Sequence, residues 1–187
     1  MVAASVLFIA FSVSLLSVWN RAEAQPADVD ISDLGFKPTG YMGDIGDIKF
    51  TSGWMDNERG ACIKIDYSAA NSSGKGWAGI YWQYPPGNWG DQPGKYLTGA
   101  RDLKFWARGE NGKERAEFMV GGIPGDSVTP ALSTGVKNLT AKWTEYHIDL
   151  SNRDLSNVKG GFFWTSSREK NPNGCTIYLA DIKYVYS

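Results

Sequence analysis

Short runs rich in Val, Ile, Phe, Tyr and Trp recur along the chain, separated by Gly, Pro, Asn and Asp. Runs of this length with turn residues between them are typical of an all-β sandwich or barrel. Helical periodicity is weak, so the predicted fold class is all-β. We expect strands over eight segments: 48–51, 61–68, 77–84, 102–108, 116–121, 144–150, 161–165 and 176–186.

Alternation within each run predicts which side chains face the core, because successive side chains on a strand point to opposite faces. In DLKFWARG the apolar set is Leu103, Phe105 and Ala107. Trp106 and Arg108 therefore point outward. The same reasoning places Glu117 of AEFMVG and His147 of TEYHIDL on outer faces.

The stretch GWAGIYWQYPPGNWGD concentrates aromatic residues in few positions. Ile80 and Trp82 form its core face with Tyr84, while Tyr81 and Gln83 point outward. Proline donates no backbone hydrogen bond and glycine weakens a strand, so PPGNWGD is expected to be a loop. That loop presents Trp89 near its middle.

The residue inventory argues against an enzyme. His147 is the only histidine, which excludes a His-rich zinc site. The sequence also contains no G-x-S-x-G motif that would supply a serine nucleophile. A glycosidase needs two carboxylates about 5–10 Å apart. Outward Glu117, Glu145 and Asp149 supply carboxylates, but without the close spacing of a β-sandwich glucanase signature.

A binding function fits the outward residues better. Sugars present apolar C–H faces that stack on aromatic rings, and their hydroxyls form hydrogen bonds with polar side chains. The sequence therefore predicts a carbohydrate-binding surface on one sheet face and its loops. The expected contact residues share an outward position and an aromatic or hydrogen-bonding side chain: Tyr81, Gln83, Trp89, Trp106, Arg108, Glu117 and His147.

The N-terminal residues indicate export. Residues 6–16 are uncharged and mostly apolar, and Ala22-Glu23-Ala24 matches a cleavage site, so residues 1–24 are interpreted as a signal peptide. The apolar run is shorter than the roughly 20 residues of a membrane span, and no second span appears in the mature part. We therefore expect a secreted protein, extracellular or periplasmic, without a membrane segment. Residues 25–39 are expected to form an N-terminal lead-in.

Charge and cysteines constrain the partners and the cross-links. The net charge of −1 and the lack of a basic cluster give no basis for nucleic-acid binding. Cys62 and Cys175 both lie in the mature part, where export permits a disulfide. A bond between them and two free buried thiols are both compatible with the sequence.

Five segments resemble a known group of proteins: GWAGIYWQYPPGNWGDQPG, LTGARDLKFWARGENG, FMVGGI, KWTEYHIDLSNRDLSNVKGGFFW and GCTIYLADIKY. They are similar to exported bacterial domains with the galactose-binding-like jelly roll, a β-sandwich fold shared by many carbohydrate-binding modules. The resemblance implies a single jelly-roll domain over residues 40–187. That fold also carries adhesion and purely structural roles, so it is less specific for function.

The resemblance also suggests a structural calcium site. Modules of this fold often hold calcium with an acid in the last strand, in a pattern such as Tyr-Leu-Asp-Asp-Ile. Here the stretch is YLADI, and Ala180 replaces the first acid. Asp181 with Asp44 and Asp47 would supply the hard oxygen ligands that calcium prefers.

Two other functions stay open at this point. A structural protein of the extracellular surface would use exposed aromatics and residues 25–37 for self-assembly or docking to a partner. A β-sandwich glycoside hydrolase or lyase would need a catalytic carboxylate pair that the spacing does not indicate.

Overall fold

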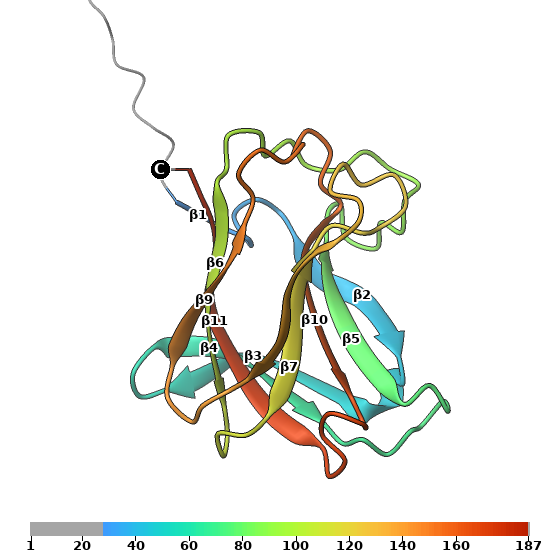
Figure 1. The fold of residues 1–187 in the computed structure, drawn as a ribbon, viewed down its shortest axis with the longest axis vertical. Helices are drawn as coiled ribbons and strands as arrows, with labels where there is room; N and C mark the ends of the chain where they lie inside the picture. The colour runs from blue at the N-terminus through green and yellow to red at the C-terminus, as the bar shows by residue number, and fades with distance from the viewer. Residues whose placement is uncertain (1–27, 187) are drawn as a thin grey trace, which may run out of the picture.

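The computed structural model of the chain describes residues 28–186, which form two antiparallel sheets packed face to face (Figure 1). No helix in this range has the length and apolar character needed to span a membrane. One 3₁₀ turn, Ile45–Asp47, precedes β3. The strands in chain order are β1 (Val29–Asp30), β2 (Lys37–Gly43), β3 (Ile48–Asp56), β4 (Gly60–Tyr67), β5 (Trp77–Gln83), β6 (Asp102–Gly109), β7 (Arg115–Val120), β8 (Leu132–Asn138), β9 (Thr144–Asp149), β10 (Gly160–Ser167) and β11 (Cys175–Val185).

The two sheets are built from strands that alternate along the chain. Sheet A has the order β3-β4-β11-β6-β9, with β1 also paired to β11, and sheet B has the order β2-β5-β10-β7-β8. Figure 1 shows β6 and β9 on one side of the molecule and β2 and β5 on the other. Most consecutive strands, such as β5 and β6, belong to opposite sheets, and only β3 with β4 and β7 with β8 pair within one sheet.

The core between the sheets confirms the alternation predicted from the sequence. Leu103, Phe105 and Ala107 of β6 are fully buried and face Ala116, Phe118 and Val120 of β7. The rings of Phe105 and Phe118 lie 4.7 Å apart between centroids. Burying aromatic rings of this size supplies much of the hydrophobic stabilisation of a small domain.

All eight predicted strands are present, with β3 longer than expected, and three further strands were missed. β2 contains Pro38 and two glycines, a composition that disfavours a strand, yet it lies at the edge of sheet B, where proline is tolerated. β8 has a polar sequence with Gly135 and is the other edge of that sheet. β1 has two residues, too few to give a pattern.

Part of the expected lead-in belongs to the sandwich. β1 pairs with β11 through Val29 opposite Tyr184. Ile31 and Phe36 are buried in the core between the sheets. The domain therefore begins before residue 40, while the signal-peptide prediction for residues 1–24 lies outside the described residues.

The two cysteines are free thiols, so of the two possibilities that the sequence left open the structure contradicts the Cys62 to Cys175 disulfide. In the pairing of β4 with β11, Cys175 lies opposite Tyr67, five residues along β4 from Cys62. At about 3.4 Å per residue this separates the two Cα atoms by roughly 17 Å, whereas a disulfide needs less than about 7 Å. Their side chains also point to opposite faces of sheet A, because Cys62 packs in an outer cluster and Cys175 packs against the core.

Candidate functional site

The seven predicted contact residues lie on two opposite faces of the sandwich and cannot form one site. The reason is that alternation separates inward from outward side chains but does not assign a strand to a sheet. Trp106 and Arg108 (β6) and His147 (β9) lie on the outer face of sheet A. Tyr81 and Gln83 (β5), Glu117 (β7) and Trp89, in the loop after β5, lie on the side of sheet B.

On sheet A, cations of the protein itself cover the aromatic rings. The Arg59 guanidinium lies 3.5 Å from the centroid of the Trp106 ring, and that of Arg108 lies 3.8 Å from the Tyr178 ring. Arg59 also forms an ion pair with Asp181 at 2.6 Å. Trp106 is therefore not an open stacking platform, because Arg59 occupies one face of its ring.

Asp56 connects the members of this layer. Its carboxylate accepts hydrogen bonds from Trp143 Nε1 at 3.0 Å and from Arg108 Nη2 at 3.1 Å. Burial opposes ionisation, but hydrogen bonds from the backbone of Glu58 and Arg59 and from these two side chains lower the pKa of Asp56 to about 2. The aromatic and charged side chains on this part of the outer face of sheet A therefore hold one another in place.

His147 takes part in a separate contact on sheet A. Its Nδ1 lies 2.9 Å from Oδ1 of Asp102, which joins β9 to β6. The imidazole is mostly exposed at the edge of that sheet. The structure therefore separates His147 from the members of the predicted contact set that lie on sheet B.

On sheet B, two stacked aromatic rings form the floor of the outer face. The rings of Tyr81 and Phe163 lie 4.0 Å apart at an interplanar angle of 9°. Gly79 makes room for them, because a Cβ there would lie 2.5 Å from the Phe163 ring. Ile123 is buried in the same cluster, and Met42, Trp77 and Met119 pack against it while remaining partly exposed.

Trp89 stands at one end of this floor. Its side chain is 41% exposed, and its ring meets that of Tyr81 edge to face at 6.1 Å. The loop is held by the buried side chain of Asn88, which donates to the carbonyls of Tyr84 and Gln92 and accepts from the amides of Gly90 and Gln92. Trp89 is therefore a large apolar side chain presented on a braced loop, as the sequence predicted.

Gln83 and Tyr81 face outward as predicted, but both are buried, which corrects their assignment as exposed contacts. Gln83 has no exposed surface, because its Nε2 donates to the carbonyl of Asn88 and its Oε1 accepts from the Thr39 hydroxyl, each at 2.9 Å. Tyr81 is 7% exposed and donates to the carbonyl of Gly121. Burial, with a contribution from Asp126, raises the pKa of Tyr81 to about 12. Both residues support the Trp89 loop and the floor.

A buried lysine, which sequence reasoning missed, joins the Trp89 loop to its neighbour. Lys159 Nζ donates to the carbonyl of Gly90 at 2.8 Å and to that of Pro124 at 3.0 Å. Asp126 accepts hydrogen bonds from the amides of Lys159, Gly160 and Val128. Nothing in the local sequence around Lys159 signals its burial, because its partners come from two distant loops.

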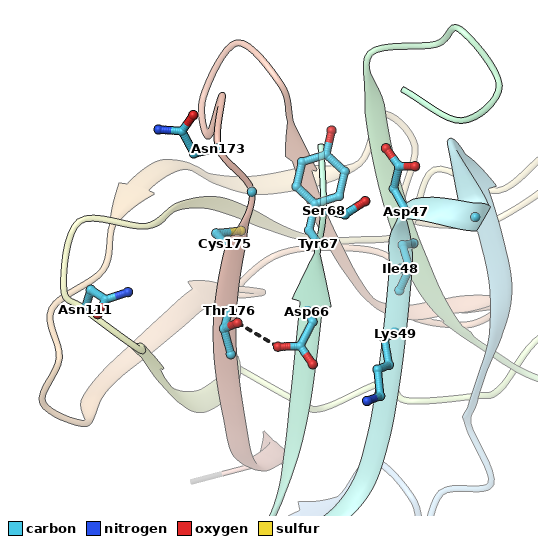
Figure 2. A pocket seen from close by; sticks show the side chains of 12 residues that line it. Asp47, Ile48, Lys49, Asp66, Tyr67, Ser68, Asn111, Asn173, Cys175 and Thr176 are labelled. Carbon is cyan, nitrogen blue, oxygen red and sulfur yellow. Dashed lines mark hydrogen bonds between the residues drawn. The ribbon is translucent and has the colours of Figure 1, made fainter. Parts of the chain in front are cut away.

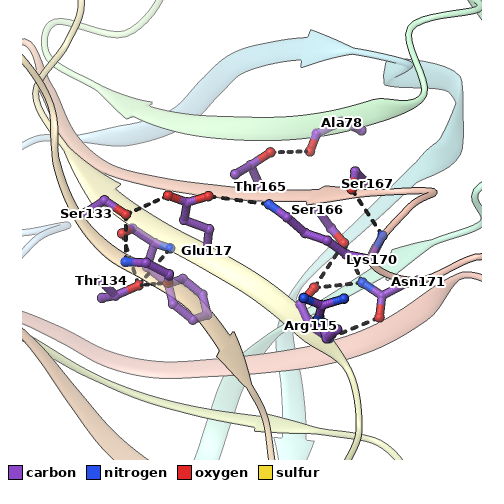
Figure 3. Close-up of polar contacts among 12 residues, drawn as sticks. Ala78, Arg115, Glu117, Ser133, Thr134, Thr165, Ser166, Ser167, Lys170 and Asn171 are labelled. Atoms are coloured by element: carbon purple, nitrogen blue, oxygen red, sulfur yellow. Dashed lines mark hydrogen bonds and ion pairs between the residues drawn. The ribbon is translucent and has the colours of Figure 1, made fainter.

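A polar cluster lies on the other side of the same face (Figure 3). Glu117 accepts a hydrogen bond from the Ser133 hydroxyl at 2.6 Å and forms an ion pair with Lys170 at 3.4 Å. Thr165 of β10 lies opposite Glu117 in register. The sequence identified Glu117 as outward but missed Ser133 and Lys170, which come from an edge strand and a turn.

The three acids considered for calcium do not form one site. Asp44 is buried and accepts hydrogen bonds from the amides of residues 73, 75 and 76, and Asp47 accepts from those of residues 71 and 72. Asp181 is paired with Arg59. Within residues 28–186, no three His, Cys, Asp or Glu side chains are grouped to hold a metal. The carboxylates instead hold the 71–76 loop and the β3–β4 turn.

Comparisons with known proteins identify solved structures with a similar fold. No family model and no curated protein sequence matches the chain. A family 30 carbohydrate-binding module is similar over 86% of this chain and 88% of its own, with a TM-score of 0.58 and 17% identity. A family 11 module from Clostridium thermocellum, solved with a β-1,3-1,4-mixed-linked tetrasaccharide, is similar over 86% of this chain and 95% of its own, with a TM-score of 0.57 and 12% identity.

A third solved structure is an agarase, of which the chain covers 25% with a TM-score of 0.55 and 10% identity. At these identities the likeness concerns the fold alone. The expected jelly-roll β-sandwich, of the kind found in carbohydrate-binding modules, is confirmed.

Proposed function

We propose that this chain is a non-catalytic carbohydrate-binding domain whose binding surface is the outer face of sheet B. The observation that carries the proposal is the exposed indole of Trp89 on a braced loop beside an apolar floor and a polar cluster. The binding surface consists of Trp89, Trp77, Met119, Thr165, Glu117 and Lys170.

The chemistry of this face suits a sugar chain. The C–H face of a pyranose ring packs on the flat indole of Trp89, which removes apolar surface from water. Glu117 accepts hydrogen bonds from sugar hydroxyls, and Lys170 donates to them. Since neighbouring strands lie about 4.8 Å apart, the four strands from β5 to β8 span roughly 15 Å, enough for several linked units.

The face is also rigid before a ligand arrives. Asn88 and Lys159 hold the Trp89 loop, and Lys170 and Ser133 hold Glu117. A surface that is already ordered loses little conformational entropy on binding, so more of the contact energy contributes to affinity. The family 11 module crystallised with a tetrasaccharide supports this proposal through its similar fold.

Two observations favour binding over hydrolysis. The partner of Glu117 is a cation, whereas a glycosidase places a second carboxylate about 5–10 Å from the first. The agarase in the comparison is four times as long as the part that this chain matches. We therefore propose a binding role and not a hydrolase or lyase activity.

The test is affinity electrophoresis of the mature protein in gels that contain single polysaccharides, among them mixed-linkage β-glucan, agarose, xylan and mannan. We expect retardation by at least one polysaccharide and its loss in Trp89→Ala. Trp106→Ala is the matched control, because it removes an indole from the opposite face. Absence of retardation across a broad panel would overturn the proposal, as would equal binding by the wild type and Trp89→Ala.

Export of the mature protein is a companion proposal that rests on the N-terminal residues. Expression of the full chain with a C-terminal tag, followed by fractionation and mass determination, tests it. Recovery outside the cytoplasm with residues 1–24 removed would support export, and recovery of the uncleaved chain in the cytoplasm would contradict it.

One observation favours self-association as a second candidate. Met55 is 71% exposed and Trp54 is 40% exposed, and both lie on β3, an edge strand of sheet A with unpaired backbone groups. Light scattering after size-exclusion chromatography tests it. A concentration-dependent oligomer that Met55→Lys abolishes would favour assembly, and a monomer at all concentrations would argue against it.

A further inference from the structure

A hollow of about 420 Å³ lies at the end of sheet A, where β3 and β11 begin and β4 ends (Figure 2). This volume falls within the range of small-molecule sites. Its lining exposes polar and apolar surface in similar amounts and comes from four segments that are distant in sequence. Around it lie residues 46–49, residues 66–68, Asn111 and residues 173–176.

Several hydrogen-bonding groups at this hollow are not engaged by the protein. Asp66 uses Oδ1 to accept from the Thr176 hydroxyl at 2.6 Å, and its Oδ2 has no partner among the described residues. The side chains of Lys49, Asn111 and Asn173 likewise form no hydrogen bond or ion pair with other residues in the range 28–186. A carboxylate oxygen, an ammonium and two amides therefore remain available around the hollow.

Buried polar side chains hold the walls of the hollow in place. Glu114 is 6% exposed and accepts hydrogen bonds from the amides of residues 111, 112 and 113. Asn171 is 7% exposed and bonds to both backbone groups of Arg115 and to the Ser166 hydroxyl, which fixes the turn before β11. Buried polar side chains thus hold both the 111–113 loop and the turn before β11, and such support is typical of a preorganised site.

The hollow is also connected to the proposed binding surface on sheet B. A second hollow of about 250 Å³ shares Asn111, Asn173 and Gly174 with the first and reaches Lys170. Lys170 forms the ion pair with Glu117 on sheet B. Two adjoining hollows therefore lead from Lys170, beside that face, around the end of the sandwich to Asp66.

We propose that the 420 Å³ hollow is a second binding site, which takes a single polyhydroxylated unit such as the terminal sugar of a glycan. Hydroxyl groups both donate and accept, so they match a set containing Lys49, Asp66, Asn111 and Asn173. The charges at the hollow balance, because Asp47 and Asp66 are matched by Lys49 and by Lys64, which forms an ion pair with Asp66 Oδ1 at 3.6 Å. A neutral ligand with both polar and apolar surface, such as a sugar, suits this mixed lining. The proposal rests on the proposed function only in the choice of sugars as probes.

The experiment is nitrogen-15 NMR of the mature protein titrated separately with glucose, galactose, mannose, xylose and calcium chloride. We expect at least one sugar to shift the amides of residues 46–49, 66–68, 111 and 173–176 in a saturable manner. Asp66→Ala and Asn173→Ala should each weaken that binding about tenfold or more, because each removes a hydrogen-bonding group. Asp154→Ala, in an exposed loop, is the control and should bind as the wild type does.

Three results would overturn the second site. They are no amide shift at the hollow with any sugar, equal sugar affinity in Asp66→Ala and the wild type, and amide shifts at the hollow with calcium chloride but with none of the sugars. Asn173→Ala keeps the test valid if Asp66→Ala fails to fold. Retardation by polysaccharide gels is measured on the same variants. Loss of retardation in Trp89→Ala but not in Asp66→Ala separates the sheet B surface from the hollow, so each proposal fails or holds independently.

Discussion

The guanidinium of Arg59 lies 3.5 Å from the centroid of the Trp106 ring, on the face of sheet A opposite the side that carries Trp89. From the sequence, Trp106 and Trp89 were both expected to contact the ligand. The structure gives them different roles, because Arg59 occupies one face of the Trp106 ring while Trp89 stays exposed.

Trp106→Ala should reduce the free energy of unfolding by about 2 kcal/mol, through lost packing and the lost cation–π contact with Arg59. Urea denaturation measures this change. Retardation of the variant in polysaccharide gels should equal that of the wild type. Weakened binding without a loss of stability would show that sheet A carries the sugar site after all.

Trp82 and Trp89 lie close in sequence, but their substitution should have opposite consequences. Trp82 is 3% exposed in the core, so Trp82→Ala should cost about 3–5 kcal/mol of folding free energy. Trp89→Ala should cost less than about 1 kcal/mol and abolish polysaccharide binding. Denaturation curves and gel retardation of both variants test the pair, and a large stability loss in Trp89→Ala would contradict it.

Lys159→Met should loosen the Trp89 loop, because two carbonyls lose a charged donor. The expected cost is about 2–3 kcal/mol, and binding should weaken as the loop loses its order. Hydrogen exchange should accelerate at the amides of residues 88–92. Arg153→Met, at an exposed position, serves as the control. Unchanged exchange in the loop would mean that Lys159 does not hold it.

The lowered pKa of Asp56 makes part of the stability dependent on pH. Because the pKa in the folded state is about 2, below the ordinary value of 3.8, the stabilisation is present above about pH 4 and is lost as the pH falls through 2. Urea denaturation at several pH values between about 5 and 2 should show this decline. Asp56→Asn should be less stable at pH 5 and should have a flatter profile, and an identical slope would refute the assignment.

Calcium should not stabilise the protein. Asp44 and Asp47 already accept backbone hydrogen bonds, and Asp181 is paired with Arg59. The melting temperature should therefore be the same in millimolar calcium and in a chelator. A rise with calcium would point to ligands outside these three acids, because a cation that binds only the folded state raises that temperature.

Much of the fold was predictable from local patterns. The inward sets of β6 and β7 are correct because the two-residue period of a strand and the burial of apolar side chains depend on adjacent residues alone. The loop at PPGNWGD is correct because proline and glycine restrict the backbone locally. The edge strands β2 and β8 were missed because they need no continuous apolar face.

The division of the outward residues between two faces was decided only by the tertiary structure. By itself, the sequence pattern determined that the chain is all-β, that Trp82 is core and that Trp89 stands on a loop, and the resemblance to jelly-roll modules added the sandwich. It did not determine that Gln83 is covered, that Trp106 is capped by Arg59 or that Lys159 joins two loops. Those facts depend on which strands pair and which distant loops meet, and the physical reason is that an outward side chain is exposed only where no other segment packs over it.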